Sequence, residues 1–215
     1  MLLTEIYPHH KDEALALLNR LADDENWEVR EWAGSAAGEL LQRHFSEIHT
    51  ALRAWLKHSS PNVRRAVAIA VRGATNNRHV ERCEPLFELI ELLVVDRDEY
   101  VRRNTGPFAV GKLLQHYPEQ TLARVRKWAD REDEMSRWNA AMVFVAAPAR
   151  KHVDAALGIL SELARDERRL VWMAVASALR HLVKRDPERV VPELRRWLAD
   201  ERKLPAALVL KRATQ

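Results

Sequence analysis

A short motif that starts helices recurs along this chain at nearly regular intervals. The copies are Val29-Arg30, Val63-Arg64, Val101-Arg102 and Ser136-Arg137, so their first residues lie 34, 38 and 35 positions apart. Eight residues before each copy stands a bulky apolar residue, in turn Leu21, Trp55, Leu93 and Trp128. Periods of this length in helical sequence are typical of stacked helix pairs, each of which buries its apolar face against its neighbours.

The period predicts the fold class. We expect an all-α protein, a HEAT-like α-solenoid of about five to six helix pairs in a right-handed stack, with residues 1–215 forming a single domain. The chain lacks the Thr-Pro-Leu-His turn of ankyrin repeats, and its six glycines leave little room for the turns of a sheet. A helix is expected to start at Pro61 with Ser60 as its cap, another at Asp186-Pro187, and a last half-repeat over 204–211.

Several classes of function find no support in the composition. Cys83 is the only cysteine, which excludes an internal disulfide and a Cys-rich zinc site. The nine histidines are scattered, so no metal site is expected, and no phosphate-loop or dinucleotide fingerprint suggests a cofactor. No apolar stretch reaches the roughly 18 residues that a membrane span needs. We therefore expect a soluble, cytoplasmic protein without a membrane partner.

Charge is distributed unevenly along the chain. Residues 1–48 hold four Lys or Arg and ten Asp or Glu, a balance of −6. The remainder holds 35 − 4 = 31 basic and 31 − 10 = 21 acidic residues, a balance of +10. A basic body suggests a polyanionic partner for the later repeats, and the alternative is an ordinary solvated surface.

The arginines fall into two groups. Arg30, Arg64, Arg102 and Arg137 recur with acids in the preceding turn, which predicts a structural ladder between neighbouring helices. Other basic residues lack such recurring acids and are better candidates for function. Arg65 and Arg72 lie seven apart and so share a helix face, and Arg103 and Lys112 occupy the next repeat. We expect these four to form a stripe that follows a phosphate backbone, with Trp138 and Arg78, in the connector 76–79, at its margins.

The seven tryptophans also divide into groups. Trp55, Trp128 and Trp197 end the first helices of repeats, where packing explains them. Trp27, Trp32, Trp138 and Trp172 lie at or near the copies of the helix-start motif, which we call the anchors. Core packing is the preferred interpretation for this second group, with stacking on bases or sugars as the alternative.

Part of the chain resembles a known family. The segments Tyr100-Val101-Arg102-Arg103-Asn104, Tyr117-Pro118-Glu119, Arg126-Lys127-Trp128 and Ser136-Arg137-Trp138 resemble the DNA alkylation repair family of HEAT-like proteins. The resemblance covers about residues 96–140. It implies an alkylpurine DNA glycosylase fold that holds duplex DNA on a concave, basic face.

The same stretch departs from the family's catalytic pattern. Pro107 and Gly111 stand where members often carry Asn and Asp, and no acid lies between Arg137 and Ala149. The family's glycosylases need a carboxylate among tryptophans to stabilise positive charge as the glycosidic bond breaks. We therefore expect duplex DNA binding without strong glycosylase activity, and the catalytic residues stay unknown.

Two alternatives remain open. A protein-interaction scaffold, the commonest use of HEAT-like arrays, would have a protein partner instead of DNA. An active glycosylase for alkylated purines would use Glu39 or another carboxylate.

Overall fold

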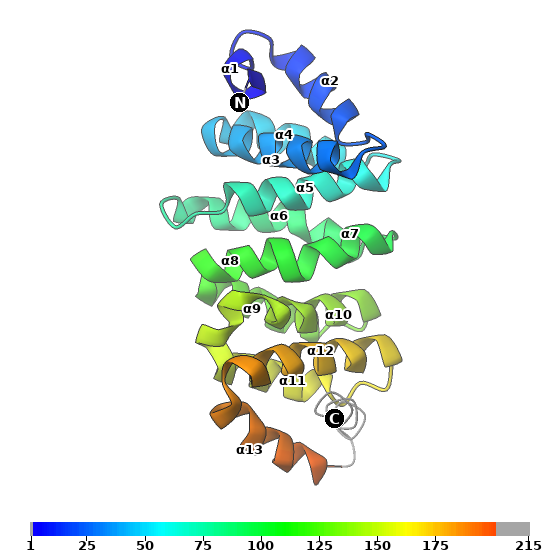
Figure 1. The fold of residues 1–215 in the computed structure, drawn as a ribbon, viewed down its shortest axis with the longest axis vertical. Coiled ribbons are helices and arrows are strands. Elements are labelled where there is room, and N and C mark those ends of the chain that lie inside the picture. The colour runs from blue at the N-terminus through cyan, green and yellow to red at the C-terminus, as the bar shows by residue number, and fades with distance from the viewer. Residues whose placement is uncertain (1, 201–215) are drawn as a thin grey trace. The chain divides into compact units, whose positions relative to one another are not determined.

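The computed structural model describes residues 2–200, and their regular secondary structure is entirely helical (Figure 1). The all-α prediction is confirmed. The half-repeat predicted over 204–211 lies outside the described residues. Contacts along the chain divide it after Ala109 into two compact units. A single domain over 1–215 stays a prediction.

The first unit runs up to Ala109. Its helices are α1 (Leu2–Ile6), α2 (Lys11–Leu21), α3 (Trp27–Arg43), α4 (Phe45–Trp55), α5 (Pro61–Ala74), the 3-10 turn η1 (Val80–Arg82), α6 (Cys83–Val94) and α7 (Glu99–Asn104). Contacts join α3 to α5 and α5 to α7, so these second helices of the repeats lie side by side. We call α3, α5 and α7 the second-helix layer of this unit, and α4 and α6, which also contact each other, its first-helix layer.

The second unit begins at Val110. Its helices are α8 (Gly111–His116), α9 (Pro118–Ala129), α10 (Glu134–Met142), the 3-10 turns η3 (Val143–Val145) and η4 (Ala147–His152), α11 (Val153–Leu163), α12 (Arg169–Arg185) and α13 (Pro187–Leu198). Here α10 and α12 form the second-helix layer, and α9, α11 and α13 the first-helix layer. The predicted pairing of helices within repeats is confirmed.

Short polar side chains start the second helices. Asn26, Ser60, Asp98 and Asp133 each accept a hydrogen bond from a backbone N–H in the first turn of α3, α5, α7 or α10. Proline stands at the start of α5, α9 and α13, where its missing N–H costs no hydrogen bond. The cap at Ser60 agrees with the prediction.

A π-helical turn interrupts the third repeat. The stretch from Glu99 to His116 consists of α7, the π turn η2 (Thr105–Val110) and α8. Pro107 lies inside this turn and has no N–H for an α-helical hydrogen bond. The local widening of the helix follows from that missing donor.

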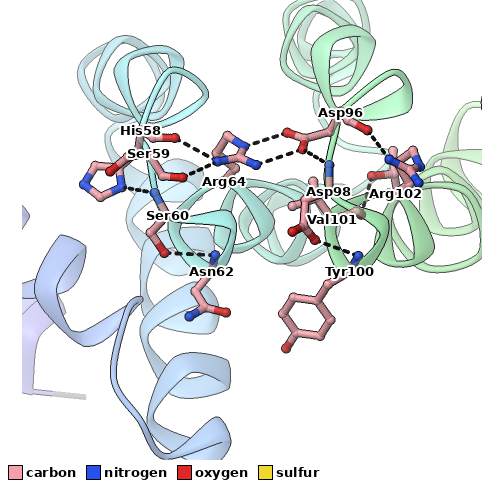
Figure 2. Close-up of polar contacts among 11 residues, drawn as sticks. His58, Ser59, Ser60, Asn62, Arg64, Asp96, Asp98, Tyr100, Val101 and Arg102 are labelled. Atoms are coloured by element: carbon pink, nitrogen blue, oxygen red, sulfur yellow. Dashed lines mark hydrogen bonds and ion pairs between the residues drawn. The ribbon is translucent and has the colours of Figure 1, made fainter.

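Each anchor arginine fastens the loop before its own helix. Arg64 Nη1 donates to the carbonyls of His58 and Ser59, at 2.9 and 2.8 Å, and Arg30 and Arg102 bind preceding carbonyls in the same way. These carbonyls follow the end of a first helix and have no helical partner. Where a carboxylate is bound, it belongs to the following repeat. Figure 2 shows Arg64 Nε and Nη2 donating to Asp96 at 2.7 and 2.9 Å, and Arg137 is ion-paired with Asp166 at 2.6 Å.

The predicted ladder is therefore present with different partners. Carbonyls, not the acids of the preceding turn, bind the arginines locally, and the acids link consecutive repeats.

Glycines set the closest approach between two second helices. A Cβ added to Gly34 would lie 2.9 Å from the side chain of Ile69, and one added to Gly38 would lie 3.0 Å from the carbonyl oxygen of Ala70. The absence of a Cβ at these two positions allows the close packing of α3 on α5.

The tryptophan prediction is correct for one group and wrong for part of the other. Trp55, Trp128 and Trp197 are buried, as expected. Trp27 and Trp32 are 63% and 61% exposed, contrary to the preferred core interpretation. Trp138 and Trp172 are partly exposed. The exposed pair lies on α3, the first helix of its layer. The main neighbours of α3 besides α5 are α1, α2 and α4.

None of the helices in residues 2–200 is long and apolar enough to cross a membrane.

Candidate nucleic-acid interface

Acidic and basic residues are distributed unevenly among the helices of both units. Helix α5 carries three arginines and no acid, and α12 carries Arg169, Arg180, Lys184 and Arg185 and no acid. In the first-helix layers, α6 carries Glu84, Glu88 and Glu91 without a Lys or Arg, and α11 carries Asp154 and Glu162 likewise. One helix in the second-helix layer of each unit, α5 or α12, therefore offers a basic surface free of acids. Basic residues are not confined to this layer, because α9 carries Arg124, Arg126 and Lys127 with Glu119.

Arg65 does not lie on that surface as a free cation. It is buried, its Nη2 is ion-paired with Glu31 of α3, and its guanidinium lies over the ring of Tyr100 of α7 at 4.7 Å from the centroid. Glu31 is thus half-buried in a link across three second helices. Arg65 acts first as a structural tie.

Arg72 and Arg78 differ from Arg65. Both side chains are exposed, and neither has a hydrogen-bond or ion-pair partner among the described residues. Arg72 lies two turns along α5 from Arg65, as the spacing of seven requires. Arg78 stands in the connector between α5 and η1. These two are the basic candidates of the first unit that are available to a ligand.

The remaining predicted residues are partly engaged. Arg103, on α7, pairs with Glu99 one turn before it at 2.5 Å, with both side chains largely exposed. Lys112, on α8, donates to Gln115 at 3.1 Å, and Trp138 is half-exposed on α10. An exposed pair of this kind costs little to break, so Arg103 keeps its charge for a polyanion.

A basic stripe on α12 was not among the predicted sites. Arg169, Met173, Arg180 and Lys184 are all exposed, and their spacings of 4, 7 and 4 place them on one face of the helix. The three basic side chains have no partner among residues 2–200. The sequence contained a signal for this stripe, because residues 169–185 include spaced Arg and Lys residues and no Asp or Glu.

The stripe has a matching position in the first unit. Arg180 lies nine residues after the buried Val171, as Arg72 lies nine residues after the buried Val63. The two arginines therefore occupy equivalent places on the second helices of their repeats.

The pKa of His181 is affected by the positive charges along α12. The pKa of His181 is lowered from its ordinary 6.5, first by burial and then by the charges of Arg185, Lys184 and Arg180. Farther toward the start of α12, burial would raise the pKa of Asp166, but hydrogen bonds from Arg168 and the charge of Arg137 lower it overall. Arg168 and Arg137 are therefore ion-paired with Asp166. The basic side chains of the stripe have no such partner in the described part of the chain.

The carboxylates of α3 near the exposed Trp27 and Trp32 differ in their surroundings. Glu31 lies between Trp27 and Trp32 in sequence, but its carboxylate is neutralised by Arg65. Glu39 is half-buried on α3. Within residues 2–200, no group of three His, Cys, Asp or Glu side chains is placed to hold a metal ion.

Comparisons with known proteins identify the family. A family model described as DNA alkylation repair enzyme matches residues 104–215, and a model of HEAT repeats matches residues 14–86. Comparison with curated protein sequences finds no match.

Two crystal structures share the fold. They are smu.31 from Streptococcus mutans UA159 and AlkD2 from Streptococcus mutans, each 16% identical to this chain with a TM-score of 0.68. The first similarity covers 91% of this chain and 96% of the other, and the second covers 93% and 96%. The HEAT-like fold and the resemblance noted over residues 96–140 are confirmed. Because the family model spans more than half of its residues, the chain belongs to the DNA alkylation repair enzyme family.

Proposed function

We propose that this protein binds duplex DNA through the second-helix layers of its two units, by contacts to phosphates, and that it lacks strong glycosylase activity. The observation that carries the proposal is that α5 and α12, each in the second-helix layer of its unit, carry basic residues and no acids. Phosphate contacts give affinity without reading base edges, which suits a row of arginines and lysines.

The side chains assigned to DNA are those that the fold leaves available. In the first unit they are Arg72, Arg78 and Arg103, and in the second Lys112, Arg169, Arg180 and Lys184, with Trp138 beside them. Arg65 contributes by holding Tyr100, whose ring is 38% exposed, and not by contacting a phosphate itself. An exposed ring next to basic residues can stack on a sugar or an unpaired base.

The weakness of glycosylase activity follows from Glu31. Breaking a glycosidic bond builds positive charge on the sugar, and a nearby carboxylate has to be free to stabilise it. Glu31 is already paired with Arg65, so its charge is compensated before any substrate arrives. Purified protein should release little 3-methyladenine or 7-methylguanine from alkylated duplex DNA, and robust release of either base would refute this part of the proposal.

The test of DNA binding is fluorescence anisotropy with an intact duplex and with a duplex that contains an abasic site, across a salt series. Each phosphate contact should add roughly −0.9 to the slope of log K against log salt. Arg169→Ala, Arg180→Ala and Lys184→Ala together should flatten the slope by about 3. A matched variant changes Glu84, Glu88 and Glu91 of α6 to Gln and should leave the slope unchanged. Absence of binding by the wild type at low salt would reject the proposal.

One observation favours a second function, that of a protein scaffold. Leu92 on α6 and Val95, the residue that follows this helix, are exposed near Glu88 and Glu91. Such a surface suits a basic segment of another protein with apolar anchors. The first-helix layer would then hold a protein while the second-helix layer holds DNA.

A further inference from the structure

A polar pocket lies where the end of α3 meets the connector that follows α5. It has a volume of about 340 Å³ and is lined by Gln42, Asn76, Arg78, His79 and Arg82. No acidic side chain is part of this lining. The pocket therefore combines two arginines, a histidine and two amides in one concave place.

Arg82 is held in a fixed position at the pocket. Its Nη1 donates to the carbonyl of Gln42 at 3.0 Å, and its guanidinium lies over the ring of Phe45 at 4.6 Å from the centroid. The remaining N–H groups of this side chain have no partner among residues 2–200. A planar group that is already oriented loses little freedom when it binds an anion.

The opposite wall is held by the connector itself. The backbone N–H of Arg78 donates to Asn76 Oδ1 at 3.0 Å, and Asn76 Nδ2 donates to the carbonyl of Ala74 at 3.1 Å. These bonds form a turn that places the root of the Arg78 side chain. Gln42 Nε2 donates to the carbonyl of Gly73, which joins the end of α3 to the end of α5. Both walls are thus fixed, and the Arg78 guanidinium stays free to close on a ligand.

The chemistry of the lining selects the ligand. Two guanidinium groups present paired donors. These match the several oxygens of a phosphate better than they match a single halide ion. His79 Nδ1 is hydrogen-bonded to Glu81 at 2.9 Å, so that exposed carboxylate lies at the rim and is engaged by the histidine. The positive charges of the lining itself are the two arginines.

We propose that this pocket is a binding site for a phosphate group, held between Arg78 and Arg82. Identification of that group as a phosphate of DNA rests on the proposed function. The binding of phosphate as such does not.

The test is a titration of the full chain with inorganic phosphate at constant ionic strength. Binding is monitored by the NMR signals of the arginine Nε–H groups. The signals of Arg78 and Arg82 should shift and saturate, while that of Arg72, an exposed arginine outside the pocket lining, should not. Arg78→Ala should weaken phosphate binding at least about tenfold, and Arg72→Ala should not change it. Arg82→Lys keeps the charge but loses the fork and should also weaken binding. Shifts that are linear in phosphate, or equal at Arg72 and Arg78, would overturn the proposal.

Duplex DNA separates this proposal from the proposed function. Displacement of phosphate by an intact duplex identifies an internal phosphodiester as the natural ligand, and displacement only by a duplex with a 5′-phosphorylated nick identifies a terminal phosphate. Saturable phosphate binding without any DNA binding leaves the pocket in place and removes the DNA function. In the opposite outcome, phosphate binding does not saturate and Arg78→Ala leaves DNA binding unchanged. That result refutes the phosphate pocket and keeps the DNA function.

Discussion

The guanidinium of Arg65 lies over the ring of Tyr100 while its Nη2 is ion-paired with Glu31, so one side chain connects α3, α5 and α7. Arg72, on the same helix, has no partner among the described residues. Two arginines seven residues apart therefore have different tasks, the first in stability and the second in binding.

These tasks can be separated by substitution. Arg65→Ala leaves the half-buried Glu31 without its partner and should lower the free energy of unfolding by about 1–3 kcal/mol. Arg72→Ala should change it by no more than about 0.5 kcal/mol while weakening DNA binding. Urea unfolding and anisotropy on the same preparations give both quantities. Equal stability of the two variants would mean that the Arg65 link contributes nothing.

Arg64 should be far more sensitive than the exposed arginines. The side chains of Arg64 and Asp96 are only 6% and 7% exposed, and removal of one partner leaves a buried charge uncompensated. Arg64→Ala should cost about 3–5 kcal/mol, measured by chemical denaturation. Arg103→Ala, which breaks the exposed pair with Glu99, is the control and should cost about 0.5 kcal/mol or less. A cost below about 1 kcal/mol for Arg64→Ala would contradict the buried ladder.

The tryptophans offer a matched comparison of burial. Trp128 is fully buried and Trp32 is 61% exposed. Trp128→Ala should lower the free energy of unfolding by about 3–5 kcal/mol, whereas Trp32→Ala should change it by about 0.5 kcal/mol or less. Thermal unfolding followed by circular dichroism distinguishes the two. If Trp128→Ala melted like the wild type, its place in the core would be wrong.

Two helical glycines should respond to alanine with opposite signs. A Cβ at Gly38 meets backbone atoms of Ala70 and Gly73 at 3.0 and 3.2 Å, and these cannot move without separating α3 from α5. Gly38→Ala should therefore destabilise by about 1–3 kcal/mol. Gly158, on α11, has nothing within 4 Å of an added Cβ, so Gly158→Ala should stabilise by up to about 1 kcal/mol through helix propensity. A stabilising Gly38→Ala would show that the helices can separate freely.

His181 should report the approach of DNA. Its pKa is lowered by burial and by Arg185, Lys184 and Arg180, so without DNA the stability falls as pH drops below 6.5 toward the folded-state pKa. A phosphate near these cations favours the charged imidazole and should raise that pKa. DNA affinity should then increase as pH falls through the raised value, and His181→Gln should lose this increase. NMR titration of the ring, with and without duplex, measures the shift. An unchanged pKa in the complex would place DNA away from α12.

The repeat period predicted positions that the repeats after the first one bury. Val63, Val101 and Ser136 are fully buried, as is Trp128 eight residues before its anchor. The period cannot show where a layer begins. Trp32 stands three residues after Val29, as Ala66 stands three after Val63, and Ala66 shares a helix face with Ile69 and Gly73, which pack on α3. Because α3 starts its layer, the same face of α3 stays open and Trp32 is exposed.

The candidate site was predictable in part for a similar reason. The face of Arg72 followed from helical spacing, but the partner of Arg65 lies one repeat earlier, 34 residues away. Alignment of the repeats places Glu31 and Arg65 at the same position, two after their anchors, with opposite charge. The opposite charges of Glu31 and Arg65 at this position were the only sign of an ion pair in the sequence. The contact itself depends on the packing of α3 against α5.

The separation of charge between α6 and α5 also affects how the protein meets a partner. A net charge of +4 is small for 215 residues, yet in the first unit α6 carries acids without bases and α5 bases without acids. The first unit therefore has an electric dipole directed from its acidic to its basic helix. A polyanion turns such a body during diffusion, so that the basic helix arrives first and fewer encounters are unproductive. Added salt should accordingly slow association with DNA more than the small net charge implies.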